Sequence, residues 1–146
     1  MKEVPKLSKE FFLSWILTFV FLYGISYLWH GVLLNDLSRV NYSINFFLLL
    51  LAIVYFAISF VLTFLIHFLA QFGKNKVRRG LMIGMPMGIF IYLITFVFGI
   101  SFYSNPTLNH ILFDLSWQVI EQAIGGVVAG GLLSITAGVR SHKHNF

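Results

Sequence analysis

Long apolar runs separated by short polar stretches set the pattern of this chain. Four of the runs reach the length of a membrane-spanning helix, which needs about 20 residues to cross a hydrocarbon core of ~30 Å. They cover residues 11–34, 44–70, 80–102 and 115–139. None alternates between apolar and polar positions as a barrel strand does, and backbone groups in lipid must be hydrogen-bonded within their own segment. The pattern therefore predicts a single all-α domain, residues 1–146, that crosses a membrane as a four-helix bundle.

The start of the fourth helix is marked by Asn105 and Pro106, a pair typical of a helix N-terminus. A helix from Pro106 to Val139 would be roughly 50 Å long, which exceeds the thickness of a bilayer core. We therefore expect a short interfacial helix that bends near Asp114 before the fourth span begins. One long tilted helix is the alternative.

Charged residues are scarce and unevenly placed. Only 10% of the 146 residues are charged and 58% are hydrophobic, whereas soluble domains carry about 25% charged residues. A net charge of +5 would raise the question of nucleic acid in a soluble protein. Here the cations flank apolar runs, so we expect the lipid bilayer as partner and no nucleic acid. Four of them form a predicted headgroup-binding loop between the second and third runs: Lys74, Lys76, Arg78 and Arg79.

The remaining cations predict the orientation, because cytoplasmic segments of membrane proteins are enriched in Lys and Arg. Those before the first run and after the fourth are Lys2, Lys6, Lys9, Arg140 and Lys143. The two loops on the other side hold only Arg39. We therefore expect both termini and the central loop in the cytoplasm. Aromatic residues suited to an interface fall near the outer ends at Trp29, Tyr42, Tyr103 and Trp117, and near the inner ends at Trp15.

Small residues recur every four positions in the third and fourth runs. They are Gly80, Gly84 and Gly88 in the third run, and Gly126 and Gly130 in the fourth. This spacing places them on one face of each helix, where a missing side chain lets two backbones approach closely. We expect these faces either to make the third and fourth helices the tightest pair or to form an oligomer interface.

An ionisable residue within a span is costly, so Glu121 needs an explanation. Asp114 and Gln118 precede it at helical spacing. His30 lies near the outer end of the first run at a depth similar to that of Glu121, about 6 to 9 Å below the membrane boundary, so their depths allow the two to meet. One interpretation is an outward-facing proton or cation site with Asp114 and Gln118 at its mouth. The other is a structural contact between helices.

The second run carries polar residues at strict four-residue steps: Tyr55, Ser59, Thr63 and His67. Their side chains lie on one face of a helix. A face of this kind either lines a conduction path or packs against neighbouring helices.

Several kinds of chemistry find little support. The chain has no Cys, which excludes disulfides and thiolate chemistry. No glycine motif for nucleotides is complete, and the histidines lack the neighbours of a metal site, so we predict no metal and no cofactor. An intramembrane enzyme would use His30, Asp114 and Glu121 as acids and bases, but it lacks a recognisable nucleophile and is the least favoured class.

The segment from Trp29 to Asp36, together with Trp117-Gln118 and the glycines between 125 and 130, resembles small bacterial four-helix membrane proteins of unknown function. The resemblance implies the fold and a location in the bacterial plasma membrane, and it implies no activity. Two functions are favoured. One is a small ion or solute permease that works as a homo-oligomer, and the other is an accessory or assembly subunit of a larger membrane protein.

Overall fold

A computed structural model describes residues 7–41, 43–69 and 73–143 of the chain, with side chains up to Thr136. Helix α1, Lys9–Ser26, continues as a π-helical segment η1, Tyr27–Leu33, and a short 3-10 helix η2 covers Asp36–Arg39. Helices α2, α3 and α4 cover Ile44–Phe68, Lys76–Val97 and Leu108–Lys143. Residues Lys2, Lys6, Tyr42 and Ala70 of the predicted segments lie outside the described ranges.

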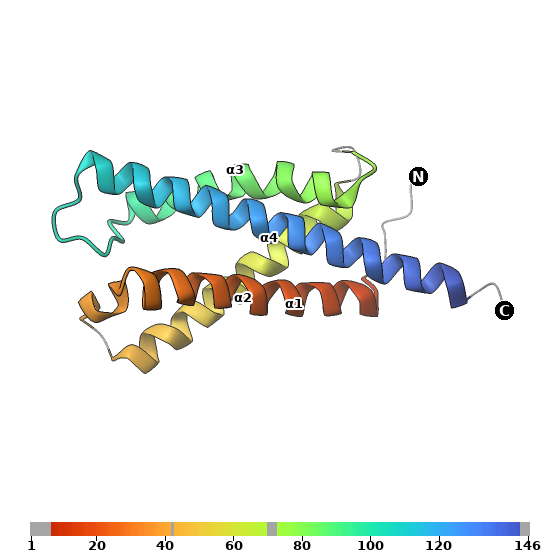
Figure 1. Ribbon diagram of the computed structural model, residues 1–146, viewed down its shortest axis with the longest axis horizontal. Helices are drawn as coiled ribbons and strands as arrows, with labels where there is room; N and C mark the ends of the chain where they lie inside the picture. The colour runs from red at the N-terminus through yellow and green to blue at the C-terminus, as the bar shows by residue number, and fades with distance from the viewer. Residues whose placement is uncertain (1–6, 42, 70–72, 144–146) are drawn as a thin grey trace.

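The four long helices form an elongated bundle (Figure 1). The start of α1, the connection from α2 to α3 and the end of α4 lie at one end of it, and the other two connections lie at the opposite end. The described residues contain no strand, and each long helix is apolar enough and long enough to cross a membrane. The predictions of an all-α fold and of four such helices are therefore confirmed.

Side-chain oxygens cap the N-termini of helices α1, α2 and α3. Ser8 and Ser43 each accept the backbone N–H three residues ahead at 3.4 Å, and Asn75 Oδ1 accepts that of Val77 at 2.9 Å. Such caps satisfy N–H groups that have no partner within the helix. Because Asn75 is the cap, α3 begins at Lys76 rather than at the predicted residue 80. Three of the four clustered cations therefore lie in the first turn of α3 and not in a loop.

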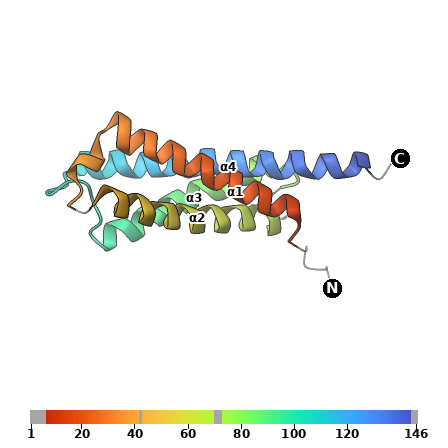
Figure 2. The same ribbon diagram turned by 90° about the horizontal axis from the view of Figure 1, so that it is seen from below.

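Helix α4 is continuous, so the expected bend near Asp114 is wrong and the alternative of one long helix is correct. Thr107 Oγ1 accepts the backbone N–H of His110 at 3.4 Å, and the Thr107 N–H donates to His110 Nδ1 at 3.3 Å. No Gly or Pro interrupts residues 108–121. The 36 residues make a helix of roughly 54 Å, and its C-terminal end extends beyond the other helices (Figure 2).

Glycines bring α3 and α4 together backbone to backbone, and these two helices share the most extensive contact in the bundle. A Cβ atom added at Gly88 would lie 2.6 Å from the carbonyl oxygen of Gln118. Cβ atoms at the other four predicted packing positions would come closer still to carbonyl oxygens of the facing helix: Gly80, Gly84, Gly126 and Gly130. The glycine faces are thus used within one chain.

The buried apolar core is small, and the outside of the bundle is apolar. The core packs around Leu22, Leu62, Ile66, Ala129 and Leu133. Large exposed apolar side chains occur on all four helices. Such a surface is unfavourable in water and suits contact with lipid tails.

Candidate functional site

Glu121 lies in the interior of the bundle, near the middle of the span Leu108–Thr136, and is 0% exposed. Its Oε1 accepts a hydrogen bond from the hydroxyl group of Tyr55 at 2.6 Å. Tyr55 is itself buried near the middle of α2. No salt bridge reaches Glu121 from the side chains that the structure describes. A carboxyl group held by a hydroxyl and by no cation thus lies deep among apolar helices.

Ser26 on α1 completes the arrangement. Its Oγ lies 2.8 Å from the hydroxyl oxygen of Tyr55. A phenol carries one proton, so when Tyr55 donates to Glu121 the Ser26 hydroxyl donates to Tyr55. We refer to Ser26, Tyr55 and Glu121 as the Glu121 cluster, which joins α1, α2 and α4.

Several buried polar atoms have no hydrogen-bond partner within the described part of the chain. Glu121 Oε2 is one, and both side-chain polar atoms of Gln122, a residue that is 0% exposed, are two more. Others are Ser14 Oγ, Thr63 Oγ1, His67 Nε2 and Trp29 Nε1. An unpaired buried polar group costs about 1–3 kcal/mol. Glu121 Oε2 and the two polar atoms of Gln122 lie on adjacent residues of α4 near the middle of its span.

The polar stripe on α2 faces the interior. Tyr55, Ser59 and Thr63 are buried, and His67 continues the stripe half-buried near the end of the helix. A matching stripe on α1 was not predicted from the sequence, and three hydroxyl residues of this helix are buried: Ser14, Thr18 and Ser26. Their spacing in multiples of four was the available signal. Thr18 donates to the Ser14 carbonyl at 2.7 Å, so this hydroxyl is satisfied by its own helix.

His30 contacts Asp36 and not Glu121, so the pairing that their depths allow is not formed. His30 Nδ1 lies 2.9 Å from Asp36 Oδ2, and Asp36 is only 2% exposed. The other carboxylate oxygen accepts from Arg39 at 3.3 Å. The physical reason is local: α1 passes into the π-helical η1, and Asn35, with φ of 54°, turns the chain so that η2 lies beside His30.

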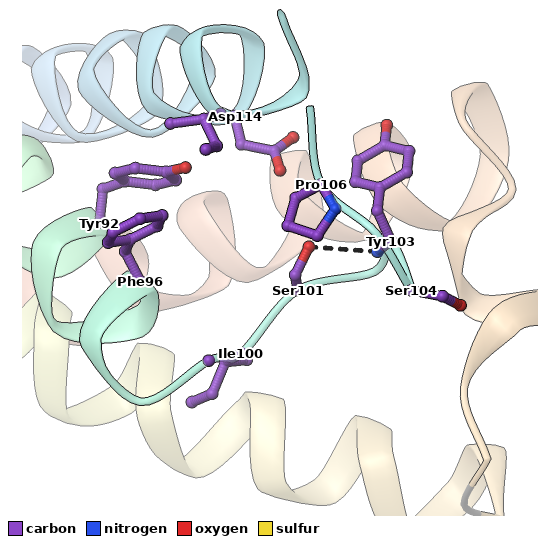
Figure 3. A pocket seen from close by; sticks show the side chains of 10 residues that line it. Tyr92, Phe96, Ile100, Ser101, Tyr103, Ser104, Pro106 and Asp114 are labelled. Carbon is purple, nitrogen blue, oxygen red and sulfur yellow. Dashed lines mark hydrogen bonds between the residues drawn. The ribbon is translucent and has the colours of Figure 1, made fainter. Parts of the chain in front are cut away.

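Asp114 and Gln118 lie on α4 before Glu121, outside the Glu121 cluster. Asp114 lines a pocket of about 250 Å³ between the end of α3, the start of α4 and the connection that joins them. Figure 3 shows its carboxylate directed into this space. Gln118 is half-buried, and its backbone carbonyl faces Gly88. Glu121 therefore bonds to Tyr55 and His30 to Asp36, while His30 acts on Asp114 electrostatically.

Two of the four predicted headgroup ligands hold the fold together instead. Arg79 is 5% exposed, and its guanidinium donates to the carbonyls of Ile66 at 2.7 Å and Gly73 at 2.6 Å. The last carbonyls of a helix have no partner within it, and Ile66 lies in the last turn of α2. Lys76 Nζ donates to the Leu133 carbonyl at 2.8 Å. The exposed pair is Lys74 and Arg78.

Trp29 and Trp117 stack on each other and join α1 to α4. Their ring centroids are 3.8 Å apart and their planes differ by 6°. The sequence places both rings near the outer interface, and Trp117 lies one helical turn before Glu121 on the same helix. The stack therefore neighbours the Glu121 cluster.

The residues that the structure describes include no group of three or more His, Asp or Glu side chains that could hold a metal ion. Four apolar helices around a buried carboxyl group fit an integral, multi-pass membrane protein. No family model, curated protein or solved structure matches the chain.

Proposed function

We propose that this protein is a small permease of the bacterial plasma membrane that moves a proton or another small cation, with Glu121 as the binding group. The observation that supports this proposal is the complete burial of Glu121 near mid-span, with a hydroxyl partner and with no cationic partner among the described side chains. A charge at the centre of a membrane helix costs about 2.5–3.5 kcal/mol in insertion experiments. A buried carboxyl group therefore requires a proton or a cation. Such a group suits the uptake and release of a transported cation.

Neighbouring hydroxyls support a path to and from Glu121. Tyr55 can pass a proton to the carboxyl group, because a phenol both donates and accepts. Along α2, Ser59 and Thr63 continue toward His67 in steps of about 6 Å. Thr63 Oγ1 and His67 Nε2 have no partner within the described residues, so both can bond to a moving ion or to its hydration water.

The proposal includes the orientation and the assembly. Both termini and the exposed Lys74 and Arg78 face the cytoplasm, and the opposite connections, which carry Arg39 as their one Lys or Arg, face outward. The chain forms a homo-oligomer, since four helices alone leave little interior for a gated path.

Proton flux into liposomes tests the role of Glu121. Purified protein is reconstituted with a pH-sensitive dye inside and a compensating potassium current. We expect Glu121→Gln, which keeps the shape and a hydrogen-bond acceptor for Tyr55, to lower the flux at least roughly tenfold. Thr18→Val is the matched control, because it removes a buried hydroxyl that bonds only to its own helix. Equal flux through wild type and Glu121→Gln would overturn the proposal.

The alternative is an accessory subunit of a larger membrane protein. An accessory subunit would need its glycine faces free to bind the partner. The five predicted packing glycines of α3 and α4 instead pack against each other's helix within the chain. Mass measurement of the assembly extracted in mild detergent separates the two functions. A discrete homo-oligomer supports the permease, and constant co-purification of one larger protein supports the accessory role.

A further inference from the structure

The pocket at Asp114 is a second polar region, separate from the Glu121 cluster. It is a partly open pocket of about 250 Å³, lined by residues of α3, α4 and the connection between them. Asp114 is the one charged side chain in its lining, and Tyr92 and Phe96 of α3 form part of the wall (Figure 3). The pocket therefore combines a single negative charge with aromatic rings.

Asp114 has no ion pair and no hydrogen bond to its side chain among the described residues. His30, Asp36 and His110 act on it electrostatically without contact. His30 is bound to Asp36. No cation of the described chain therefore neutralises the Asp114 carboxylate directly.

Aromatic rings of the pocket suit a cation. Tyr92 and Phe96 lie one turn apart on α3 with nearly parallel rings, 6.3 Å between centroids and 26° between planes. The faces of such rings attract ammonium groups. Tyr103, also in the lining, has the guanidinium of Arg39 5.4 Å from its ring centre. This end of the bundle thus already holds one cation near an aromatic ring.

The volume limits the ligand. One water molecule occupies about 30 Å³ of liquid, so the pocket has room for roughly eight non-hydrogen atoms. We propose that it binds a small organic cation, an alkylammonium group held between the Asp114 carboxylate and the rings of Tyr92 and Phe96. This inference goes beyond the permease proposal, because binding at this pocket requires no transport.

Calorimetric titration of the detergent-purified full chain tests the pocket. Tetramethylammonium is the probe, and tert-butanol is its uncharged counterpart of the same shape. We expect tetramethylammonium to bind and tert-butanol to bind at least roughly tenfold more weakly. Asp114→Asn should weaken tetramethylammonium binding by a similar factor. Thr18→Val is the matched control, since it removes a buried hydroxyl that bonds only to its own helix and lies outside the pocket lining, and it should leave the affinity unchanged.

Phe96→Leu provides a second variant that keeps the carboxylate and an apolar wall. We expect it to weaken binding roughly three-fold through the lost ring face. Equal affinity for both probes, or full affinity in folded Asp114→Asn, would overturn the inference; if Asp114→Asn does not fold, full affinity in Phe96→Leu does so. Binding without proton flux would contradict the permease proposal alone, and flux without binding would contradict the pocket alone.

Discussion

Arg79 and Glu121 show two opposite uses of a charged side chain in an apolar bundle. Arg79 donates to the carbonyl of Ile66 in the last turn of α2 and to that of Gly73 in the connection that follows, which supports the fold. Glu121 keeps one oxygen without a partner in the described chain. An isolated acid in an apolar run stands out in the sequence, so Glu121 could be singled out. The role of Arg79 could not be predicted from the sequence. A basic segment between two spans has the same sequence pattern whether its cations bind lipid headgroups or the carbonyls at the end of a helix.

Replacing Arg79 should destabilise the protein. We expect Arg79→Ala to lower the free energy of unfolding by about 2 kcal/mol, because it leaves the Ile66 carbonyl buried and unpaired. Denaturant unfolding in detergent micelles measures the change. Arg78→Ala removes an exposed cation from the same turn and should alter stability by less than about 0.5 kcal/mol. Equal effects of the two variants would contradict the structural role.

Gln122 should behave in the opposite way. Both of its side-chain polar atoms are buried without a partner, so Gln122→Leu removes a desolvation cost at similar volume. We expect the free energy of unfolding, measured by denaturant in detergent micelles, to rise by about 1 kcal/mol. A less stable variant would show that the amide is hydrogen-bonded in the folded protein.

At the scale of helices, run length and hydropathy predicted the four elements, and local chemistry decided their ends. Because Asn75 caps α3, the helix begins within the basic segment and before the predicted start at residue 80. The expected bend near Asp114 failed because no helix-breaking residue lies there. The meeting of His30 with Glu121 assumed a regular helix end, and neither the π-helical turn nor the left-handed Asn35 has a periodic signature in the sequence.

The contact between α3 and α4 gives a sharp test on two adjacent glycines. A Cβ at Gly130 would collide with the Lys76 carbonyl, whereas a Cβ at Gly131 would meet nothing within 4 Å. We expect Gly130→Ala to lower the free energy of unfolding by about 1–3 kcal/mol. Gly131→Ala should leave it unchanged or raise it by roughly 0.5–1 kcal/mol. Thermal unfolding followed by circular dichroism compares the two, and similar losses would contradict the packing.

The molecule has two polar regions, one buried in the middle of the bundle and one at the end where two connections lie. The Glu121 cluster is enclosed by three helices, and the His30–Asp36 pair and the Asp114 pocket lie where the connections α1–α2 and α3–α4 meet. This division was not predictable from depth along single helices. It depends on how four helices pack, and residue spacing within one helix carries no such information.

The proposed orientation can be tested on the unmodified background, since the chain contains no Cys. Asn41 and Lys74 are exposed in connections at opposite ends of the bundle. We expect Asn41→Cys to react with a membrane-impermeant maleimide on spheroplasts, and Lys74→Cys to react only after permeabilisation. The reverse pattern would place both termini outside.

The position of Glu121 on the last helix also has a consequence for biosynthesis. Helices leave the ribosome in chain order, so α1 and α2 enter the membrane before α4 is complete. Until then the hydroxyl of Tyr55 lacks its carboxyl partner, and the glycine face of α3 lacks the backbone it packs against. The nascent three-helix chain therefore lacks both the acceptor of the Tyr55 hydroxyl on α4 and the backbone that packs on the glycine face of α3. Assembly of the interior must wait for the final helix.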